Sequence, residues 1–245
     1  MLIQDITDAE LVLVGIGSEM QVKLQTLKGM PGFEEKLSVL EGDQDREWLI
    51  PFLIRYYLKK EFHPEITNAY EKLLGMLEGK NYFIVSLSTD DLIREMGFKE
   101  ERITLPCGTY HLLQCAENCE GKLFQIGESF WGQVCGWIEG DVSLEQLEEP
   151  KCPDCGAPLV MNQYGQPKYN EDGYLKSWGN YTKWLQGTVN RKLCILELGA
   201  GMEFPSIVRW PFEKVCFYNK KSVFWRVHSS LSQLSEEIKM RGRSV

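Results

Sequence analysis

The sequence predicts an α/β protein, with a doubly wound parallel sheet that carries a small cysteine-rich insertion. Three observations lead to this fold class. Short apolar runs that suit buried strands alternate along the 245 residues with amphipathic segments of helical period. Two of the apolar runs end in closely spaced glycines, as buried parallel strands do where they enter a ligand-facing turn. Two short cysteine pairs interrupt the alternation between residues 115 and 155.

The first strand is expected at residues 10–17, whose sequence is ELVLVGIG. Its apolar character predicts burial on both faces, and Gly15 and Gly17 would open the turn that follows it. Turns of this kind face phosphate groups in nucleotide-binding sheets. A third glycine at the dinucleotide-binding spacing is absent, so nucleotide binding and an ordinary tight turn both remain open at this position.

Helical patterns follow from about residue 31 to residue 77. The segment 47–62, EWLIPFLIRYYLKKEF, has an apolar face with Pro51 in its first turns. The segment 64–77 begins with Pro64 at a first helical position. Three aromatic side chains of this region are expected in the core or along a groove: Tyr56, Tyr57 and Phe62.

A second strand, NYFIVSLS, runs into a helix that is expected to begin near Thr89 or Asp90. The polar residues Ser88, Thr89 and Asp90 would therefore lie at the carboxyl end of a strand, where open α/β sheets bind their ligands. The Asp90 carboxylate has two interpretations. It is a candidate catalytic group, or it caps the helix and, with Asp91, favours the positive helix end.

The two cysteine pairs predict a metal site. Cys115 is paired in sequence with Cys119, and Cys152 with Cys155 in the tight turn Cys-Pro-Asp-Cys-Gly. Two such turns placed face to face supply the four thiolates of a tetrahedral zinc ion. Four protein ligands leave no open position, so the predicted zinc is structural, with one ion per chain. The alternative is a set of ordinary buried thiols.

Helix and strand alternate again in the last third of the chain. A helix is expected at 174–186, and the strand within 191–204, RKLCILELGAGMEF, closes on the 199–201 glycine turn. Three further elements are expected: a helix that begins at Pro205, a strand at 222–230 and an amphipathic helix at 231–242.

Composition excludes several classes of protein. The formal net charge of −8 and the isoelectric point near 5.1 argue against binding to nucleic acid or to an anionic membrane, and so against a zinc-ribbon nucleic-acid binder. No apolar run reaches the length of a membrane span, and the start of the chain lacks the features of a secretion signal. A cytoplasmic protein is expected. Four thiols outside the pairs are expected to be free: Cys107, Cys135, Cys194 and Cys216.

Taken together, these segments resemble the sirtuin family. The 15–17 turn resembles the family's opening Gly-Ala-Gly, and the strand that ends at Asp90 resembles the one that ends in Thr-Gln-Asn-Ile-Asp. Cys107 falls at the catalytic His of a His-Gly pair, shortly before the first zinc pair. The turn at 164–166 stands where Phe-Gly-Glu is usual, after the second zinc pair. The 199–201 turn resembles the late Gly-Thr-Ser and, with FPSIVRWPFE, is closest to the macrodomain-linked branch.

The resemblance implies a domain organisation and a cofactor. Residues 1–114 and 166–245 would form a Rossmann-like domain, with a helical module within about 30–78, and residues 115–165 a zinc-binding insertion. NAD would lie between these parts. The residues implied to contact NAD are Gly15, Gly17, Gly199, Ala200, Gly201 and His228. Those implied to act in catalysis are Asp90, Ser88 and Cys107.

A sirtuin-like protein of this kind would be an NAD-dependent protein deacylase or protein ADP-ribosyltransferase that acts on a protein substrate. The alternative is a catalytically inactive protein of sirtuin fold that binds ADP-ribose, another ligand or a partner protein. Release of nicotinamide from NAD would distinguish the two.

Several positions depart from the family pattern. Ser88 replaces its Asn, and Cys107, a thiol with an ordinary pKa of about 8.5, replaces the His that acts as general base. His111, four residues further along an alternating strand, would share a face with Cys107 and is a candidate replacement. On the diphosphate side, Glu19 and Glu34 stand where a small residue and an arginine are usual. Both would repel a diphosphate if they face the cleft, and neither would if they point to solvent.

Overall fold

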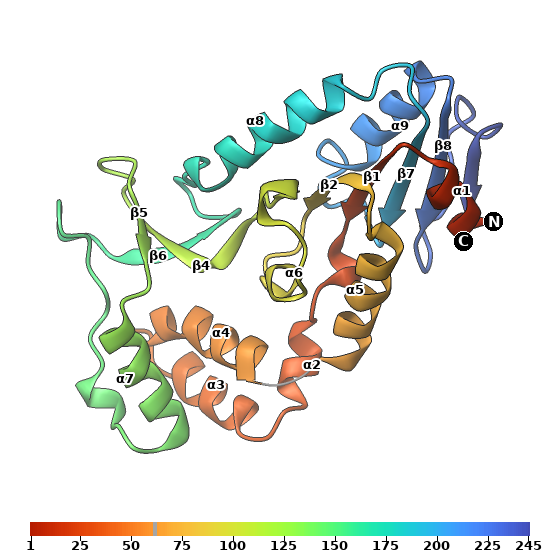
Figure 1. The fold of residues 1–245 in the computed structure, drawn as a ribbon. Helices are drawn as coiled ribbons and strands as arrows, with labels where there is room; N and C mark the ends of the chain where they lie inside the picture. Colours follow the sequence, from red (N-terminus) through yellow and green to blue (C-terminus); the bar gives the residue numbers. More distant parts are fainter. Residues whose placement is uncertain (61–62) are drawn as a thin grey trace.

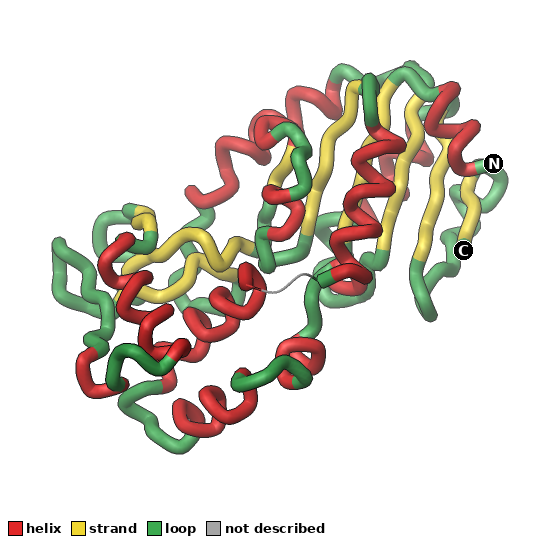
Figure 2. Tube along the Cα trace, turned by 60° about the horizontal axis from the view of Figure 1, so that its bottom comes forward, coloured by secondary structure: helices red, strands yellow, loops and turns green. Residues whose placement is uncertain are grey.

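The computed structural model describes residues 1–60 and 63–245. Its centre is a six-stranded sheet in which all neighbouring strands are parallel, in the order β3-β2-β1-β7-β8-β9 (Figure 1, Figure 2). The predicted doubly wound sheet with a small insertion is therefore confirmed. The strands of this sheet are β1 (Leu11–Ile16), β2 (Asn81–Ser86), β3 (Ile103–Thr104), β7 (Leu193–Leu198), β8 (Ser222–Val227) and β9 (Gly242–Ser244).

Alternate residues of β1 enter two separate cores, as the two-residue period of a strand requires. Val12 and Val14 pack in the larger core with α1 and α5, whereas Leu11 and Leu13 pack in a second core with α8 and α9. Among the described residues, no helix is long and apolar enough to cross a membrane. The helices that cover the two faces are α1 (Leu2–Asp8), α5 (Pro64–Leu77), α8 (Asp172–Gln186) and α9 (Arg209–Tyr218).

A second lobe combines two stretches that are far apart in the sequence (Figure 1). Phe130 of α7 packs edge-on against Phe52 of α4, with 5.1 Å between the ring centroids, and so joins the two stretches. The helices of this lobe are α2 (Leu24–Lys28), α3 (Phe33–Glu41), α4 (Ile50–Lys60) and α7 (Glu128–Glu139). Its antiparallel sheet has the order β5-β4-β6, with β4 (Gly108–Cys115), β5 (Leu123–Gln125) and β6 (Leu159–Gln163).

The helices predicted between residues 31 and 77 are confirmed. They are observed as α3, a 3₁₀ turn at 47–49 that leads into α4, and α5. Tyr56 and Tyr57 are buried in the larger core, as predicted. The third aromatic residue of that prediction, Phe62, lies outside the described residues.

The C-terminal part differs from the prediction at two points. The helix predicted from Pro205 begins at Arg209. The amphipathic helix predicted at 231–242 is wrong, because the chain forms turns there and then pairs with β8 as β9. Leu234 and Ile238 pack in the second core, so their four-residue spacing did indicate burial. Pairing with the open edge of β8 satisfies backbone groups that a helix would have satisfied internally.

A buried ion pair explains why the chain returns to this edge. Glu197 and Arg226 face each other across β7 and β8 and are almost wholly buried. Arg226 Nε donates to Glu197 Oε1 at 2.5 Å, and Nη2 donates to Oε2 at 2.9 Å. The remaining Arg226 Nη1 donates to the Gln233 carbonyl at 2.5 Å, which fastens the segment after β8 against the sheet.

Candidate functional site

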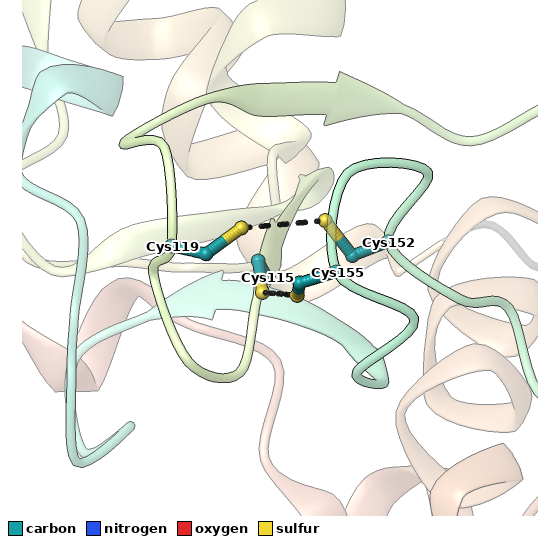
Figure 3. A group of neighbouring side chains, drawn as sticks. All are labelled: Cys115, Cys119, Cys152 and Cys155. Carbon is teal, nitrogen blue, oxygen red and sulfur yellow. Dashed lines mark hydrogen bonds between the residues drawn. The ribbon is translucent and has the colours of Figure 1, made fainter.

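The four cysteines predicted to bind metal meet at one end of the small sheet (Figure 3). The Sγ atoms of Cys115 and Cys155 are 3.5 Å apart, those of Cys119 and Cys152 are 3.7 Å apart, and all four lie within 4.8 Å of one another. Zinc–sulfur bonds of about 2.3 Å in a tetrahedron place the sulfurs about 3.8 Å apart. A disulfide would need about 2.05 Å. The sulfurs are therefore arranged as ligands of one ion.

Two tight turns position these thiols. Asn118, with a φ of 48°, and Gly156, with a φ of 78°, adopt the left-handed backbone that closes each turn. The Gly156 N–H donates to the Cys152 carbonyl at 2.8 Å. Lys122 Nζ donates to both oxygens of Asp154 at 2.9 Å and so links the strand after the first turn to the second turn.

A cleft of about 710 Å³ opens at the carboxyl edge of the parallel sheet. It lies where β1 and β7 end. The chain continues from β1 to β2 on one side of it, whereas β7 lies on the other side, so the cleft is at the switch point of the doubly wound sheet. The lining comes from the loops after β1, β7 and β8 and includes Ser18, Glu19, Lys23, Gly201, Glu203 and His228.

Two of the residues predicted to contact NAD, Gly201 and His228, line this cleft. A third, Gly15, lies inside β1 under α9. A Cβ added there would stand 2.5 Å from a methyl group of Val208. The packing of the α9 region on the sheet therefore requires this glycine, whatever the cleft binds.

The other three, Gly17, Gly199 and Ala200, do not line the cleft but lie beside it, where the loops after β1 and β7 contact each other. A Cβ on Gly17 would be 2.1 Å from the Ala200 Cα and 2.2 Å from the Gly199 oxygen. Gly199 has a φ of 64°, and a Cβ on it would be 2.6 Å from the Cβ of Glu19. The close contact of the two loops requires both glycines.

Glu19 faces the cleft, whereas Glu34 is exposed in the first turn of α3. The Glu19 carboxylate accepts the Ser229 backbone N–H at 3.1 and 3.3 Å and also the Ser229 hydroxyl. Burial raises the pKa of Glu19, but the Ser229 hydrogen bonds outweigh it and hold the pKa below its ordinary value. An ionised carboxylate of the chain thus takes a backbone donor that could otherwise bind a phosphate oxygen.

His228 presents a donor to the cleft. Its Nδ1 accepts the backbone N–H groups of Ser230 at 3.1 Å and Leu231 at 3.0 Å, so the ring proton belongs on Nε2. Glu19 Oε1 is 3.4 Å from Nδ1, but the lone pair of this nitrogen is already engaged, so the contact is no hydrogen bond. Nε2 faces Gly201. A Cβ added to Gly201 would be 3.7 Å from this nitrogen.

Ser88 and Asp90 are brought together, but both are buried beside the cleft rather than in its lining. Ser88 Oγ donates to Asp90 Oδ1 at 2.8 Å, and the Leu92 N–H donates to the same oxygen at 3.1 Å, at the start of α6 (Leu92–Glu95). The Val22 N–H donates to Oδ2 at 2.9 Å. Burial raises the pKa of Asp90, and these three donors oppose the rise. Asp90 therefore fastens the loop after β1 to the end of β2.

Cys107 is not among the residues that line the cleft, although the charge of the lining residue Glu203 acts on it. Its thiol is buried in the second core, and this burial raises its pKa to about 12, so the thiol is protonated at neutral pH. The prediction that His111 shares its face is wrong. The register of β4 shifts between Gly108 and Leu113, which breaks the two-residue alternation, and His111 lines a different cavity.

Three residues of this region were not predicted: Gln21, Lys23 and Ser229. The Gln21 amide bonds Thr89 twice, because Nε2 donates to Oγ1 at 3.3 Å and Oε1 accepts the backbone N–H at 3.4 Å. Lys23 brings a positive charge to the lining. All three lie in loops that follow a strand of the parallel sheet, and this position is the signal that could have identified them.

No family model matches the sequence. The chain is 21% identical over 254 residues to a protein of Staphylococcus aureus (strain Mu50 / ATCC 700699) named "Protein ADP-ribosyltransferase", and the match covers 96% of this chain and 79% of that protein. It is 27% identical over 155 residues to a Fusarium oxysporum f. sp. cubense protein named "Probable bifunctional ADP-ribose hydrolase/ADP-ribosyltransferase", covering 60% of this chain and 26% of that protein.

Solved sirtuin structures are also similar to this chain. One described as "Sir2 bound to acetylated peptide" has a TM-score of 0.48 at 18% identity and covers 98% of this chain and 88% of that chain. Another, of Sir2Af2 bound to a myristoylated histone peptide, has a TM-score of 0.49 at 12% identity and covers 100% of this chain and 89% of that chain. In sequence, the chain is therefore distantly similar to proteins that are named as ADP-ribosyltransferases.

Proposed function

We propose that the chain binds NAD in the cleft between the loops after β1 and β7 and acts as a protein ADP-ribosyltransferase. The position of the cleft carries this proposal, because doubly wound sheets bind nucleotides at the switch point. The relatives named as ADP-ribosyltransferases support transfer as the reaction. Lys23 and the Nε2–H of His228 are the donors that would meet the diphosphate and ribose oxygens.

Transfer is favoured over deacylation because a base for the ribose hydroxyls is missing at Cys107, whose pKa is about 12. In transfer, the bond between the ribose C1′ and nicotinamide breaks and nicotinamide leaves with the electron pair. A nucleophile of the protein substrate then forms the new bond to C1′ and loses its proton to solvent. Asp90 and Ser88 are positioning residues in this proposal, because they hold Val22 and thereby the wall of the cleft.

Nicotinamide release tests this proposal. With NAD labelled in its phosphates, the purified chain is expected to release nicotinamide and to label protein, while acyl-lysine peptides remain acylated. Asp90→Asn keeps the acceptor oxygen of the loop contact but removes the charge, and we expect nicotinamide release to drop at least about tenfold. A failure of NAD and ADP-ribose to bind at millimolar concentration would contradict the proposal.

The second candidate is a protein that binds ADP-ribose, or another ligand of this shape, without catalysis. The burial of Asp90 and Cys107 favours it, because neither side chain lines the cleft in which NAD would react. Binding of ADP-ribose without any nicotinamide release from NAD would support this candidate over the first.

We further propose that the four cysteines hold one structural zinc ion. Four thiolates at tetrahedral separations leave no coordination position for a substrate, so this ion would stabilise the small sheet and take no part in the reaction. Metal analysis of the purified chain is expected to give one zinc per chain, and Cys152→Ser is expected to lose it.

A further inference from the structure

A smaller cavity of about 250 Å³ lies between the end of α4, α6 and the start of β4. It shares no lining residue with the cleft at the switch point. Its wall contains several charged groups and a histidine: Lys59, Asp91, Arg94, Glu95, Glu100 and His111.

The Asp91 side chain in this wall lacks hydrogen bonds. The residue is 5% exposed, and neither carboxylate oxygen accepts a hydrogen bond from any described residue. Its ion-pair neighbour is Arg94, whose Nε is 3.6 Å from Oδ1, beyond hydrogen-bond length. The preceding Asp90 is buried as well but accepts three hydrogen bonds. A buried polar group without a donor costs about 1 to 3 kcal/mol, and more when it is charged.

The local fold gives no reason for a carboxylate at this position. Asp91 has a φ of 63°, a left-handed conformation that glycine adopts most easily and asparagine tolerates. Its side chain makes no capping hydrogen bond to α6. Glycine or asparagine would therefore fit the backbone here at lower cost, and the turn itself does not need a carboxylate.

Two of the three cations around Asp91 are already paired with other carboxylates. Arg94 forms an ion pair with Glu100, and Lys59 Nζ is 3.0 Å from Glu95 Oε1. The third, Arg55, donates through Nη1 to a backbone carbonyl, while its Nε lacks a hydrogen-bond partner among the described residues and its charge acts on Asp91 without a hydrogen bond. Among the carboxylates that line the cavity, Asp91 is the one without a hydrogen-bond donor from the described residues.

We propose that this cavity binds a small organic cation with N–H donors, a primary ammonium or a guanidinium group, on the Asp91 carboxylate. Such a group supplies the missing donors. The volume lies below the roughly 300 Å³ at which pockets for drug-sized ligands begin, so it suits a ligand of few atoms. A metal ion does not fit, because the one metal-type group among the described residues is the four-cysteine cluster.

Ionisation of Asp91 sets the pH dependence of binding. Burial raises its pKa to about 7, against the opposing charges of the arginines nearby. A cation binds the ionised form, so its affinity is expected to rise about tenfold from about pH 6 to about pH 8. Burial lowers the pKa of His111, which therefore adds little competing positive charge in that range. The charged and titratable groups that face Asp91 are Arg55, Lys59, Asp90, Arg94, Glu95, Glu100 and His111.

Calorimetric titration of the whole chain with guanidinium, methylammonium and tetramethylammonium chlorides, up to about 20 mM at constant ionic strength, tests this proposal. The first two are expected to bind saturably. Tetramethylammonium carries the charge without N–H donors and is expected not to bind. Asp91→Asn is expected to weaken binding at least about tenfold, whereas Glu100→Gln, at the same cavity, should change it less than about threefold.

Equal binding of the three cations, unchanged binding in Asp91→Asn, or no saturable binding at about pH 8 would each overturn the proposal. Asp91→Gly, which suits the φ of 63°, replaces Asp91→Asn if that variant does not fold. A readout on the unaltered chain is the carboxyl titration of Asp91 by NMR. Guanidinium should lower its pKa if the cation sits on the carboxylate, and an unchanged titration speaks against the site.

Discussion

At the scale of single residues, two adjacent carboxylates of one turn differ in their hydrogen bonds. Asp90 accepts three and holds the loop after β1, whereas Asp91 accepts none from the described residues. Burial raises the pKa of both. In the unfolded chain both would ionise in water, so the folded state binds protons more strongly than the unfolded state does.

The stability of the protein should therefore depend on pH through Asp91. Its pKa is about 7 in the fold against an ordinary value of 3.8, so its contribution is most favourable below about pH 4 and is lost as the pH rises through about 7. Relative to Asp91→Asn, the unaltered chain should lose on the order of a few kcal/mol across this window. Urea unfolding at several pH values measures this loss. Parallel curves for the two proteins would show that Asp91 ionises normally.

A second prediction at this scale concerns Glu19. Glu19→Gln should raise the affinity for ADP-ribose at least about tenfold. The substitution removes a negative charge beside the Ser229 N–H and frees this donor for a phosphate oxygen of the ligand. Calorimetry measures this affinity. Glu34→Gln, exposed on α3, is the matched control and should leave it unchanged. Equal affinities for Glu19→Gln and the unaltered chain would mean that the carboxylate does not compete with the ligand.

At the scale of elements, the crossing of the loops after β1 and β7 is the tightest contact near the cleft. Gly17→Ala should destabilise the fold by about 1 to 3 kcal/mol or more, because its Cβ would stand 2.1 Å from the Ala200 Cα. Gly132→Ala, in α7 with open space around the new Cβ, should instead stabilise by roughly 1 kcal/mol. Urea unfolding distinguishes the two. Similar effects from both substitutions would contradict this account of the crossing.

The elements that the sequence could predict are those with a local signal. β1 is a run of six buried residues that ends near Gly17, and its apolar sequence predicts it. The spacing within each cysteine pair likewise predicts the four-cysteine cluster. Contacts between distant residues could not be predicted in the same way. Glu19 and Ser229 are 210 positions apart, and no period or motif joins them. The bulge that separates His111 from Cys107 depends on pairing with β6, which is equally remote in the sequence.

At the scale of the whole molecule, the four-cysteine cluster lies in the second lobe, away from the parallel sheet (Figure 1, Figure 3). A strong zinc chelator should raise hydrogen exchange in β4, β5 and β6 while β1 and β7 stay protected, because structural zinc contributes about 10 to 16 kcal/mol in small modules. Cys135→Ser, outside the cluster, should keep its metal and serve as the control. Uniform exchange across both sheets after chelation would show that the lobes unfold as one unit.

The packing of α7 on α4 extends the influence of the cluster beyond its own turns. Trp48 lies 6.2 Å from the Phe130 ring, and Trp131, next along α7, holds the Arg55 guanidinium 5.0 Å from its ring centroid. Both indoles sit between the helices contributed by the two stretches of the lobe. Both tryptophans are half-buried, so if the thiolates lose their ion and the lobe loosens, more water reaches the indoles and their fluorescence should shift to the red. The intrinsic tryptophan fluorescence of this lobe should therefore report whether the cluster holds its ion, without an added label.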